Sequence, residues 1–248
     1  MALSAGFIGA ESNLVVLDLM LAPPSLDTWF GSDELGRPVL ERLIIGAQTS
    51  FVVAFSVVLF SFIIGTSIGI YSAYTGGWVD AVILKIIDVF LAFPGLLLAI
   101  ALAAILGPGI ENVVFALVTV GWVGYARLAR AQTLSFKHRE HIWAAKALGT
   151  PTYLILFKHL FPLIIATLGV EATFGVAGAV ISEAGLSFLG LGVQAPDASW
   201  GSMIREGTRY LLVAPHLVIF PGVALMLVVL AVNLAGDRLR DKLDVKNR

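Results

Sequence analysis

The sequence predicts an all-α membrane protein, a polytopic bundle of about five transmembrane helices. Of its 248 residues, 58% are hydrophobic and only 13% are charged, and the mean hydropathy is +0.92. Soluble domains contain about 25% charged residues. The charges also cluster in short segments between long apolar stretches. The absence of cysteine excludes disulfides, thiolate metal sites and cysteine nucleophiles.

Five apolar stretches account for the predicted spans. The first, 47–71, contains no charged residue and exceeds the roughly 20 residues that a helix needs to cross a bilayer. The second, 81–106, carries Lys85 and Asp88 in its first turns and Pro94, which we expect to kink it. The other three are predicted at 112–128, 160–181 and 211–236.

Two segments do not fit a membrane span. Residues 1–30 are expected to form an N-terminal tail or interfacial segment, because the apolar run 14–22 is short and is interrupted by Asp18. Residues 182–210 are rich in glycine and aromatic residues and are predicted to be irregular. Between these segments, Ser32 with Glu34 is a candidate cap for a short helix.

The distribution of lysine and arginine orients the chain. Six lie between Arg127 and Lys158, five lie in the tail from Arg238, and Lys85 falls on the same side. The opposite side receives only Arg37, Arg42, Arg205 and Arg209. Because basic residues concentrate in cytoplasmic loops, we predict that 133–160 and the C-terminus are cytoplasmic. Five spans that end inside would start outside, which favours one further N-terminal span that this sequence lacks.

Residues 137–162 form a basic, helix-forming island between two apolar stretches. Ala144, Ala145 and Leu148 would give a helix a shallow apolar stripe that fits a groove on a partner protein. Gly149 is expected to end this helix, and Pro151 to begin the next. Composition alone equally allows a connector that lies among the lipid headgroups.

The spacing Ala144-Ala145-x3-Gly149-x12-Pro162 resembles the EAA loop of binding-protein-dependent ABC importer permeases. Trp143 replaces the usual glutamate, and His159 and Phe161 replace the usual isoleucine and leucine. Three further stretches are similar to the C-type permease subunit of dipeptide, oligopeptide and nickel importers. They are FGSDELGRPVLERLIIGAQTS (30–50), SEAGLSFLGLGVQAPDASWGSMI (182–204) and AVNLAGDRLRDKLD (231–244).

The resemblance covers roughly residues 25–245 and implies the type I ABC permease fold. Residues 31–248 would form the transmembrane domain, with a cytoplasmic coupling loop at 133–160 and an extracytoplasmic loop at 182–210. Permeases of this group usually carry one more N-terminal span. The implied location is the inner membrane of a bacterial or archaeal cell, with several passes and a cytoplasmic C-terminus.

The implied function is the transmembrane subunit of an ATP-driven importer of di- or oligopeptides. Nickel or another small solute is the alternative within the same group. The implied partners are a homologous permease subunit in a heterodimer, two ATP-binding subunits, an extracytoplasmic solute-binding protein and membrane lipid. We expect no nucleic-acid partner and no cofactor.

Three sets of residues are candidate sites. The coupling site for the ATPase comprises Trp143, Ala144, Ala145, Leu148, Gly149 and Pro162. Gly190, Gly192 and Trp200 are candidates for an extracytoplasmic gate, and a packed re-entrant plug is the alternative.

Asp88 and Glu171 are candidates for the translocation path, because acids inside membrane spans are costly and could meet the α-amino group of a peptide. A local ion pair with Lys85 is the favoured alternative for Asp88. For Glu171 the alternative is a hydrogen bond to the partner permease.

Other function classes find little support. No GxxxxGK[ST] phosphate loop or G-x-S-x-G elbow occurs, so we do not expect an enzyme. The four histidines are scattered and do not predict a metal site. An ion-coupled secondary transporter, the rival class, would need inverted repeats or an acid–base relay, and the sequence shows neither.

Overall fold

The structure is a computed structural model that describes residues 15–26 and 28–245. These residues are helical apart from their connecting segments, and their only β-bridge joins Ser32 to Pro38. They divide into two compact units, each of which is described separately. Unit 1 comprises Met1–Phe55, Ile100–Val114 and Ala177–Ala231, and unit 2 comprises Ser56–Ala99, Phe115–Val176 and Val232–Arg248.

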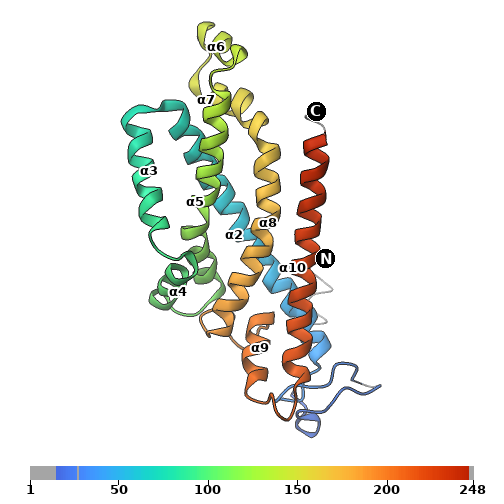
Figure 1. Cartoon of the computed structure of the whole chain (residues 1–248). Coiled ribbons are helices and arrows are strands. Elements are labelled where there is room, and N and C mark those ends of the chain that lie inside the picture. Colours follow the sequence, from blue (N-terminus) through green and yellow to red (C-terminus); the bar gives the residue numbers. More distant parts are fainter. Residues whose placement is uncertain (1–14, 27, 246–248) are drawn as a thin grey trace. The chain divides into compact units, whose positions relative to one another are not determined.

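Four helical segments are long and apolar enough to cross a membrane. They are α2 (Val39–Thr75), α5 (Ile110–Phe136), the continuous run Thr152–Phe188 that ends in α8 (Phe161–Phe188), and α10 (His216–Val245). These helices confirm four of the five predicted spans; the first three reach beyond both predicted ends, and α10 begins five residues after its predicted start and ends later. Figure 1 shows them with the shorter helices that connect them.

The predicted span 81–106 is broken, not merely kinked. It consists of α3 (Gly77–Leu91) and α4 (Gly95–Leu106), which are bent by 84° with respect to each other. Pro94 directly precedes α4, and its missing N–H and fixed φ prevent α3 from continuing through it. The described residues therefore contain four helical segments that are long and apolar enough to span a membrane, or five if this bent pair counts as one.

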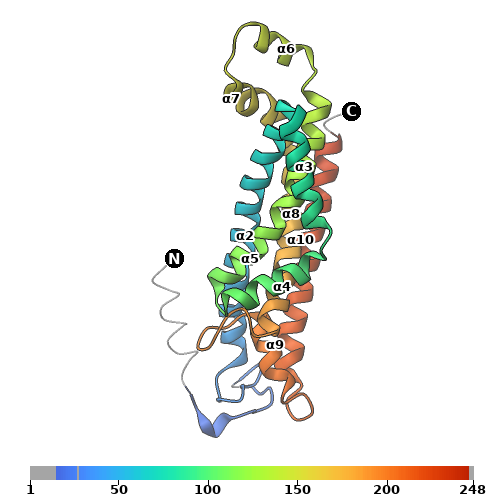
Figure 2. The same cartoon turned by 90° about the vertical axis from the view of Figure 1, so that its left-hand side faces the viewer.

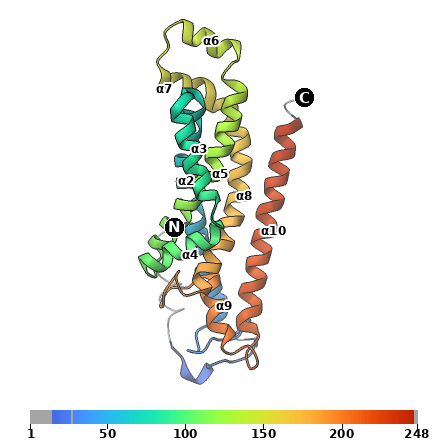
Figure 3. The ribbon, with the colours of Figure 1, turned by 60° about the vertical axis from the view of Figure 1, so that its left-hand side comes forward.

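In unit 2, α3 and α2 both pack against α5. Ile87 of α3 forms a buried cluster with Val123 and Ala126 of α5, and α3 runs beside α5 in Figures 1 and 3. On α2, a side chain at Gly65 would overlap the carbonyl oxygen of Trp122. Glycine therefore lets the backbones of α2 and α5 approach closely, as is common in membrane bundles.

Polar contacts of Ser72 and Ala73 hold the end of α2 in place in unit 2. Arg130 of α5 forms a bidentate ion pair with Asp80 of α3, with both N–O distances 2.7 Å, and the Ser72 hydroxyl donates to the same carboxylate. The Lys137 ammonium donates to the carbonyl of Ala73 at 2.8 Å, where a cation satisfies one of the last carbonyls of a helix.

In unit 1, the start of α2 packs against α9 (Trp200–Thr208) and the start of α10. Ser199 and Ser202 form a reciprocal capping box at the start of α9. A side chain at Gly207 would overlap Leu217, so α9 lies close to α10, as Figure 2 shows. The rings of Phe30 and Phe220 stack with centroids 4.1 Å apart.

The segment 182–210 is more ordered than predicted. Residues 182–188 continue α8, and α9 occupies 200–208, so only 189–199 and the residues after α9 are irregular. The apolar periodicity here is masked by glycine and serine, which are common in helices that pack closely in membranes. Of the N-terminal 30 residues, 1–14 and 27 lie outside the described residues, and the remainder contains only the short helix η1 (Leu17–Leu19).

Candidate functional site

The basic island contains a short exposed helix, α6 (Glu140–Ala147), which extends past the ends of α5 and α8 in Figure 3. Gly149 follows it with φ +75°. The amide of Gly149 donates to the carbonyl of Lys146, and the amide of Thr150 donates to that of Ala145. These two bonds form a Schellman motif, so the predicted helix end at Gly149 is correct.

The exposed face of α6 differs from the predicted stripe. Trp143 and Leu148 are 53% and 85% exposed, and Ala144 lies between them on the open side. Ala145 is only 6% exposed and faces inward with Ile142. Because Ala145 is 100° around the helix from Ala144, it supports α6 from beneath and does not present a surface to a partner.

The segment after α6 is also exposed and aromatic. Pro151 precedes the short helix α7 (Thr152–Leu154), and the six-residue π-helix η2 (Ile155–Leu160) leads into α8. Tyr153 and Phe157 are 62% and 66% exposed. Pro162 is the second residue of α8. Because π-helical turns are rare and frequently mark functional sites, this junction is part of the candidate coupling region.

The residues predicted as a gate lie in an ordered turn of unit 1. Gly190 has φ +83°, and a side chain at Gly192 would overlap Ser187. The side-chain amide Nε2 of Gln194 donates to the carbonyls of both glycines. Trp200, however, does not sit at an exposed interface: it is 3% exposed, and its Nε1–H donates to the carbonyl of Leu43 at 3.1 Å.

A buried acid near this turn, Glu183 of α8, is absent from the predicted sites. It is 1% exposed and accepts hydrogen bonds from the hydroxyls of Ser50 at 2.8 Å and Ser187 at 2.6 Å. Ser187 Oγ accepts in turn from the amide of Val193. The sequence feature that could have identified Glu183 is its position as an acidic residue at the end of an apolar stretch. Acidic residues in membrane helices commonly have a functional or structural role.

A second polar network in unit 1 also escaped prediction. Asp33 accepts from the Arg37 guanidinium at 2.7 Å and lies 3.3 Å from Arg42 Nε. Arg42, 2% exposed, also pairs with Glu206 of α9 at 3.3 Å. Burial raises the pKa of the Glu206 carboxyl above its usual value, although Arg42 opposes this shift.

The helix cap predicted at Ser32 with Glu34 is wrong. The side chain that accepts from the local backbone amides, those of Leu35 and Arg37, is Asp33.

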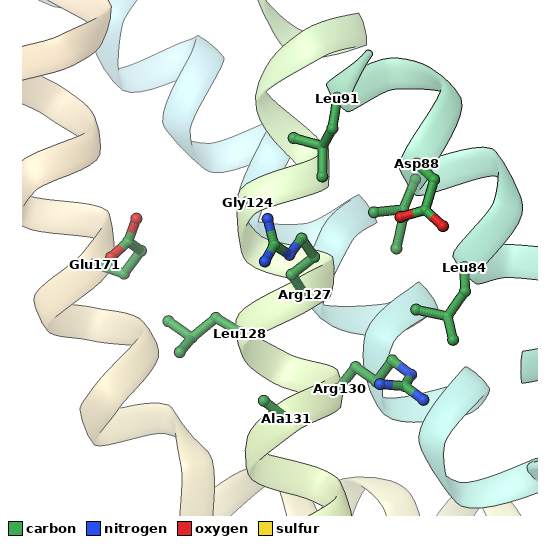
Figure 4. A pocket seen from close by; sticks show the side chains of 10 residues that line it. Leu84, Asp88, Leu91, Gly124, Arg127, Leu128, Arg130, Ala131 and Glu171 are labelled. Atoms are coloured by element: carbon green, nitrogen blue, oxygen red, sulfur yellow. The ribbon is translucent and has the colours of Figure 1, made fainter.

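The two predicted pathway acids line one cavity in unit 2. It has a volume of about 640 Å³ and is bounded by α3, α5 and α8. Asp88 comes from α3 and Glu171 from α8, and Arg127 of α5 lines the same space (Figure 4). The predicted pair between Lys85 and Asp88 does not form, since no salt bridge within the described residues includes either side chain.

The histidines are not gathered at one place. Within residues 15–26 and 28–245, no group of three or more His, Cys, Asp or Glu side chains has the arrangement of a metal site. His138 instead lies against Trp143, with ring centroids 6.3 Å apart.

The sequence was compared with known families and proteins. Residues 65–248 match the family described as binding-protein-dependent transport system inner membrane component. This match extends over most of the chain, from the middle of α2 onward. The chain belongs to this family.

Several characterised relatives share most of its length. It is 43% identical to the dipeptide transport system permease protein of Alkalihalophilus pseudofirmus, over 91% of this chain and 74% of the relative. It is 42% identical to the glutathione transport system permease protein of Pectobacterium atrosepticum, over 94% of this chain and 78% of the relative. A similar permease from Escherichia coli O157:H7 is 44% identical over 90% and 74%.

Among solved structures, an inward-facing MetNI methionine ABC transporter matches with a TM-score of 0.67 and 21% identity. The match covers 82% of this chain and 97% of the other. At this identity it shows the shared fold. It confirms the predicted class, an all-α membrane bundle of the ABC permease kind.

Family membership settles the general function. The permease is the membrane-embedded subunit of a binding-protein-dependent ABC importer, crosses the membrane several times, and works with an ATPase and a solute-binding protein. The predicted family and function are thereby confirmed.

Proposed function

We propose that this permease imports di- or oligopeptides as one half of a heterodimer of homologous permease subunits, driven by two ATP-binding subunits that dock on α6. The proposal on the solute rests on relatives at 42–44% identity, whose names specify dipeptide or glutathione transport. Glutathione is itself a peptide, so both names share one chemistry: a small solute with amide bonds and charged termini.

The coupling site is the exposed face of α6 with the segment after it. Trp143, Ala144 and Leu148 supply its apolar surface, and Gly149 stops the helix so that the chain can turn back toward α8. Ala145 and Pro162 belong to the same site as supports, the first beneath α6 and the second at the start of α8. A short rigid helix with an apolar face suits a groove on a partner protein.

The orientation follows from charge. Lysine and arginine are concentrated in 133–160 and in the tail, which supports a cytoplasmic location for this loop and the C-terminus. The segment 182–210 then faces the solute-binding protein on the other side. Gly190 and Gly192 shape its turn, and Trp200 anchors it to Leu43. Asp88 and Glu171 line the solute path through the cavity of unit 2.

The docking proposal is tested by Leu148→Asp. Leu148 is 85% exposed, so this substitution should leave the fold intact. If Leu148 is a central contact, its loss costs about 2 kcal/mol of binding, and at least a tenfold drop in ATPase co-purified with the permease is expected. The matched control is Leu212→Asp, because Leu212 is 99% exposed in unit 1. Equal ATPase recovery with both variants would contradict docking on α6.

The solute is tested by uptake assays in a strain from which the transport operon has been deleted. The operon is reintroduced with either the wild-type permease or the Leu148→Asp variant. Labelled dipeptide and glutathione should accumulate with the wild-type permease and not with Leu148→Asp. Nickel uptake should be the same with the wild-type permease and with the variant. Nickel uptake that depends on the permease, without peptide uptake, would overturn the peptide assignment.

A further inference from the structure

The cavity of unit 2 contains three charged side chains without partners. Asp88, Arg127 and Glu171 each lie in an apolar helix and are exposed to this space. None makes a side-chain hydrogen bond or salt bridge with another residue in the described part of the chain. Arg130, one turn further along α5, shows the contrast, because both arms of its guanidinium bind Asp80.

Unpaired charges in membrane helices require an explanation. A charged residue at the centre of a spanning helix costs about 2.5–3.5 kcal/mol by insertion scales, and such residues face water-filled paths or other charges. The cavity volume of about 640 Å³ is within the range of small-molecule sites. Its walls combine these charges and Arg130 with apolar side chains such as Leu84, Leu91 and Leu128. Ligand sites likewise place a few charged groups among apolar side chains.

The positive and negative side chains of the cavity have a defined arrangement. In Figure 4 the guanidinium of Arg127 is drawn between the carboxylates, with Glu171 of α8 on one side and Asp88 of α3 on the other. A guanidinium binds a carboxylate in a bidentate manner, and a carboxylate accepts from an ammonium group. Three helices therefore present a site for an anion beside sites for a cation.

We propose that this cavity recognises a zwitterionic solute at both ends: Arg127 binds the terminal carboxylate of a peptide, while Glu171, on one side of Arg127, binds its α-amino group. The proposal rests on the proposed peptide import and extends it, because it assigns selectivity to the permease as well as to the binding protein. The apolar side chains Leu84, Leu91 and Leu128 would contact the peptide without selecting its sequence.

The test uses the complete transporter, reconstituted in liposomes with its binding protein. Three versions of one dipeptide are compared: free termini, an amidated C-terminus and an acetylated N-terminus. For each version, uptake by a permease variant is divided by uptake by the wild type. The binding protein is the same in both measurements, so its preference cancels and only the contribution of the permease remains.

Arg127→Gln should reduce uptake of the free dipeptide about tenfold, because a charge-assisted bond is lost, and should leave uptake of the amidated form within about twofold of wild type. Glu171→Gln should show the complementary pattern, with the acetylated form least affected. Arg238→Gln is the control, since Arg238 is an exposed arginine of α10 outside the cavity. It should change none of the ratios.

Three results would overturn the proposal. Equal loss of uptake of all three dipeptides with Arg127→Gln would mean that the Arg127 charge is needed for transport in general and not for binding the carboxylate. No loss of uptake would mean that Arg127 does not contact the solute. If Arg127→Gln instead lost the second permease subunit during purification, the charges would be assembly contacts. Failure of peptide import itself is distinct, because wild-type liposomes would then take up none of the three dipeptides.

Discussion

Arg42 and Arg127 are both arginines in apolar helices, yet their surroundings are opposite. Arg42, in unit 1, is 2% exposed and lies between Asp33 and Glu206. Arg127, in unit 2, is exposed to a cavity and has no ion-pair partner within the described residues. Arg42 therefore holds segments of unit 1 together, whereas unit 2, which also pairs Arg130 with Asp80, leaves Arg127 available in its cavity.

The difference indicates how a permease divides its polar residues. In unit 1 a paired charge joins the start of α2 to α9, and Glu183 joins α8 to α2 and to the following turn. Such buried networks are sensitive to the loss of one member. In unit 2 the cavity charges form no salt bridge with each other within the described residues, which agrees with the proposal that they bind the solute.

The largest expected effect is on Arg42. Replacing it with methionine leaves Asp33 and Glu206 buried without this partner, which costs about 3–5 kcal/mol of folding stability. We expect a clear fall in the melting temperature of the purified permease complex, followed by intrinsic tryptophan fluorescence. Arg209→Met, at an exposed arginine, is the control. Melting of Arg42→Met at the temperature of this control would show that the network of unit 1 is not stabilising.

A smaller loss is expected at Glu183. Glu183→Ala removes the acceptor for Ser50 and Ser187, and a hydrogen bond to a charged group contributes about 1.5–3 kcal/mol. Glu183→Gln keeps an acceptor oxygen and should recover part of the loss. Glu111→Ala, at an exposed acid, provides the baseline in the same melting assay. If both variants melt at the temperature of this baseline, the hydrogen bonds of Glu183 do not contribute to stability.

These two networks also mark the limit of prediction from the sequence. Apolar stretches of sufficient length placed four spans correctly, and the helix end at Gly149 followed from local chemistry, because a glycine after a helix adopts positive φ readily. The near right angle at Pro94 was underestimated: a proline indicates a kink or break, but its angle depends on packing with other helices.

Site prediction was limited in the same way. Ala145 was assigned to an exposed stripe, because the sequence does not show which side of α6 faces η2. Asp88 and Glu171 were recognised as unusual acids from sequence alone, since charge in an apolar stretch is visible there. Arg127 was counted only as a basic residue for orientation. Its place beside these acids depends on helices far apart in the sequence.

A modest pH effect is expected from Glu206. Burial raises the pKa of this carboxyl in the folded protein, so folding favours its protonated form. The resulting stability is complete at pH values below the usual carboxyl range and is lost as the pH rises through the raised pKa. We therefore expect melting temperatures to decline slightly over this interval. Glu206→Gln should flatten the decline, and an unchanged pH profile would assign it to other groups.

The smallest effect on stability is expected for Arg127→Met. Within the described residues Arg127 has no ion-pair partner that its loss would leave unpaired. The substitution removes a charge from a membrane helix, so melting should be unchanged or slightly higher. Arg130→Met on the same helix should lower it, because Asp80 would lose both hydrogen bonds. If Arg127→Met instead destabilised the complex as Arg130→Met does, Arg127 would be a structural charge, and the contrast between the cavity and the paired networks would fail.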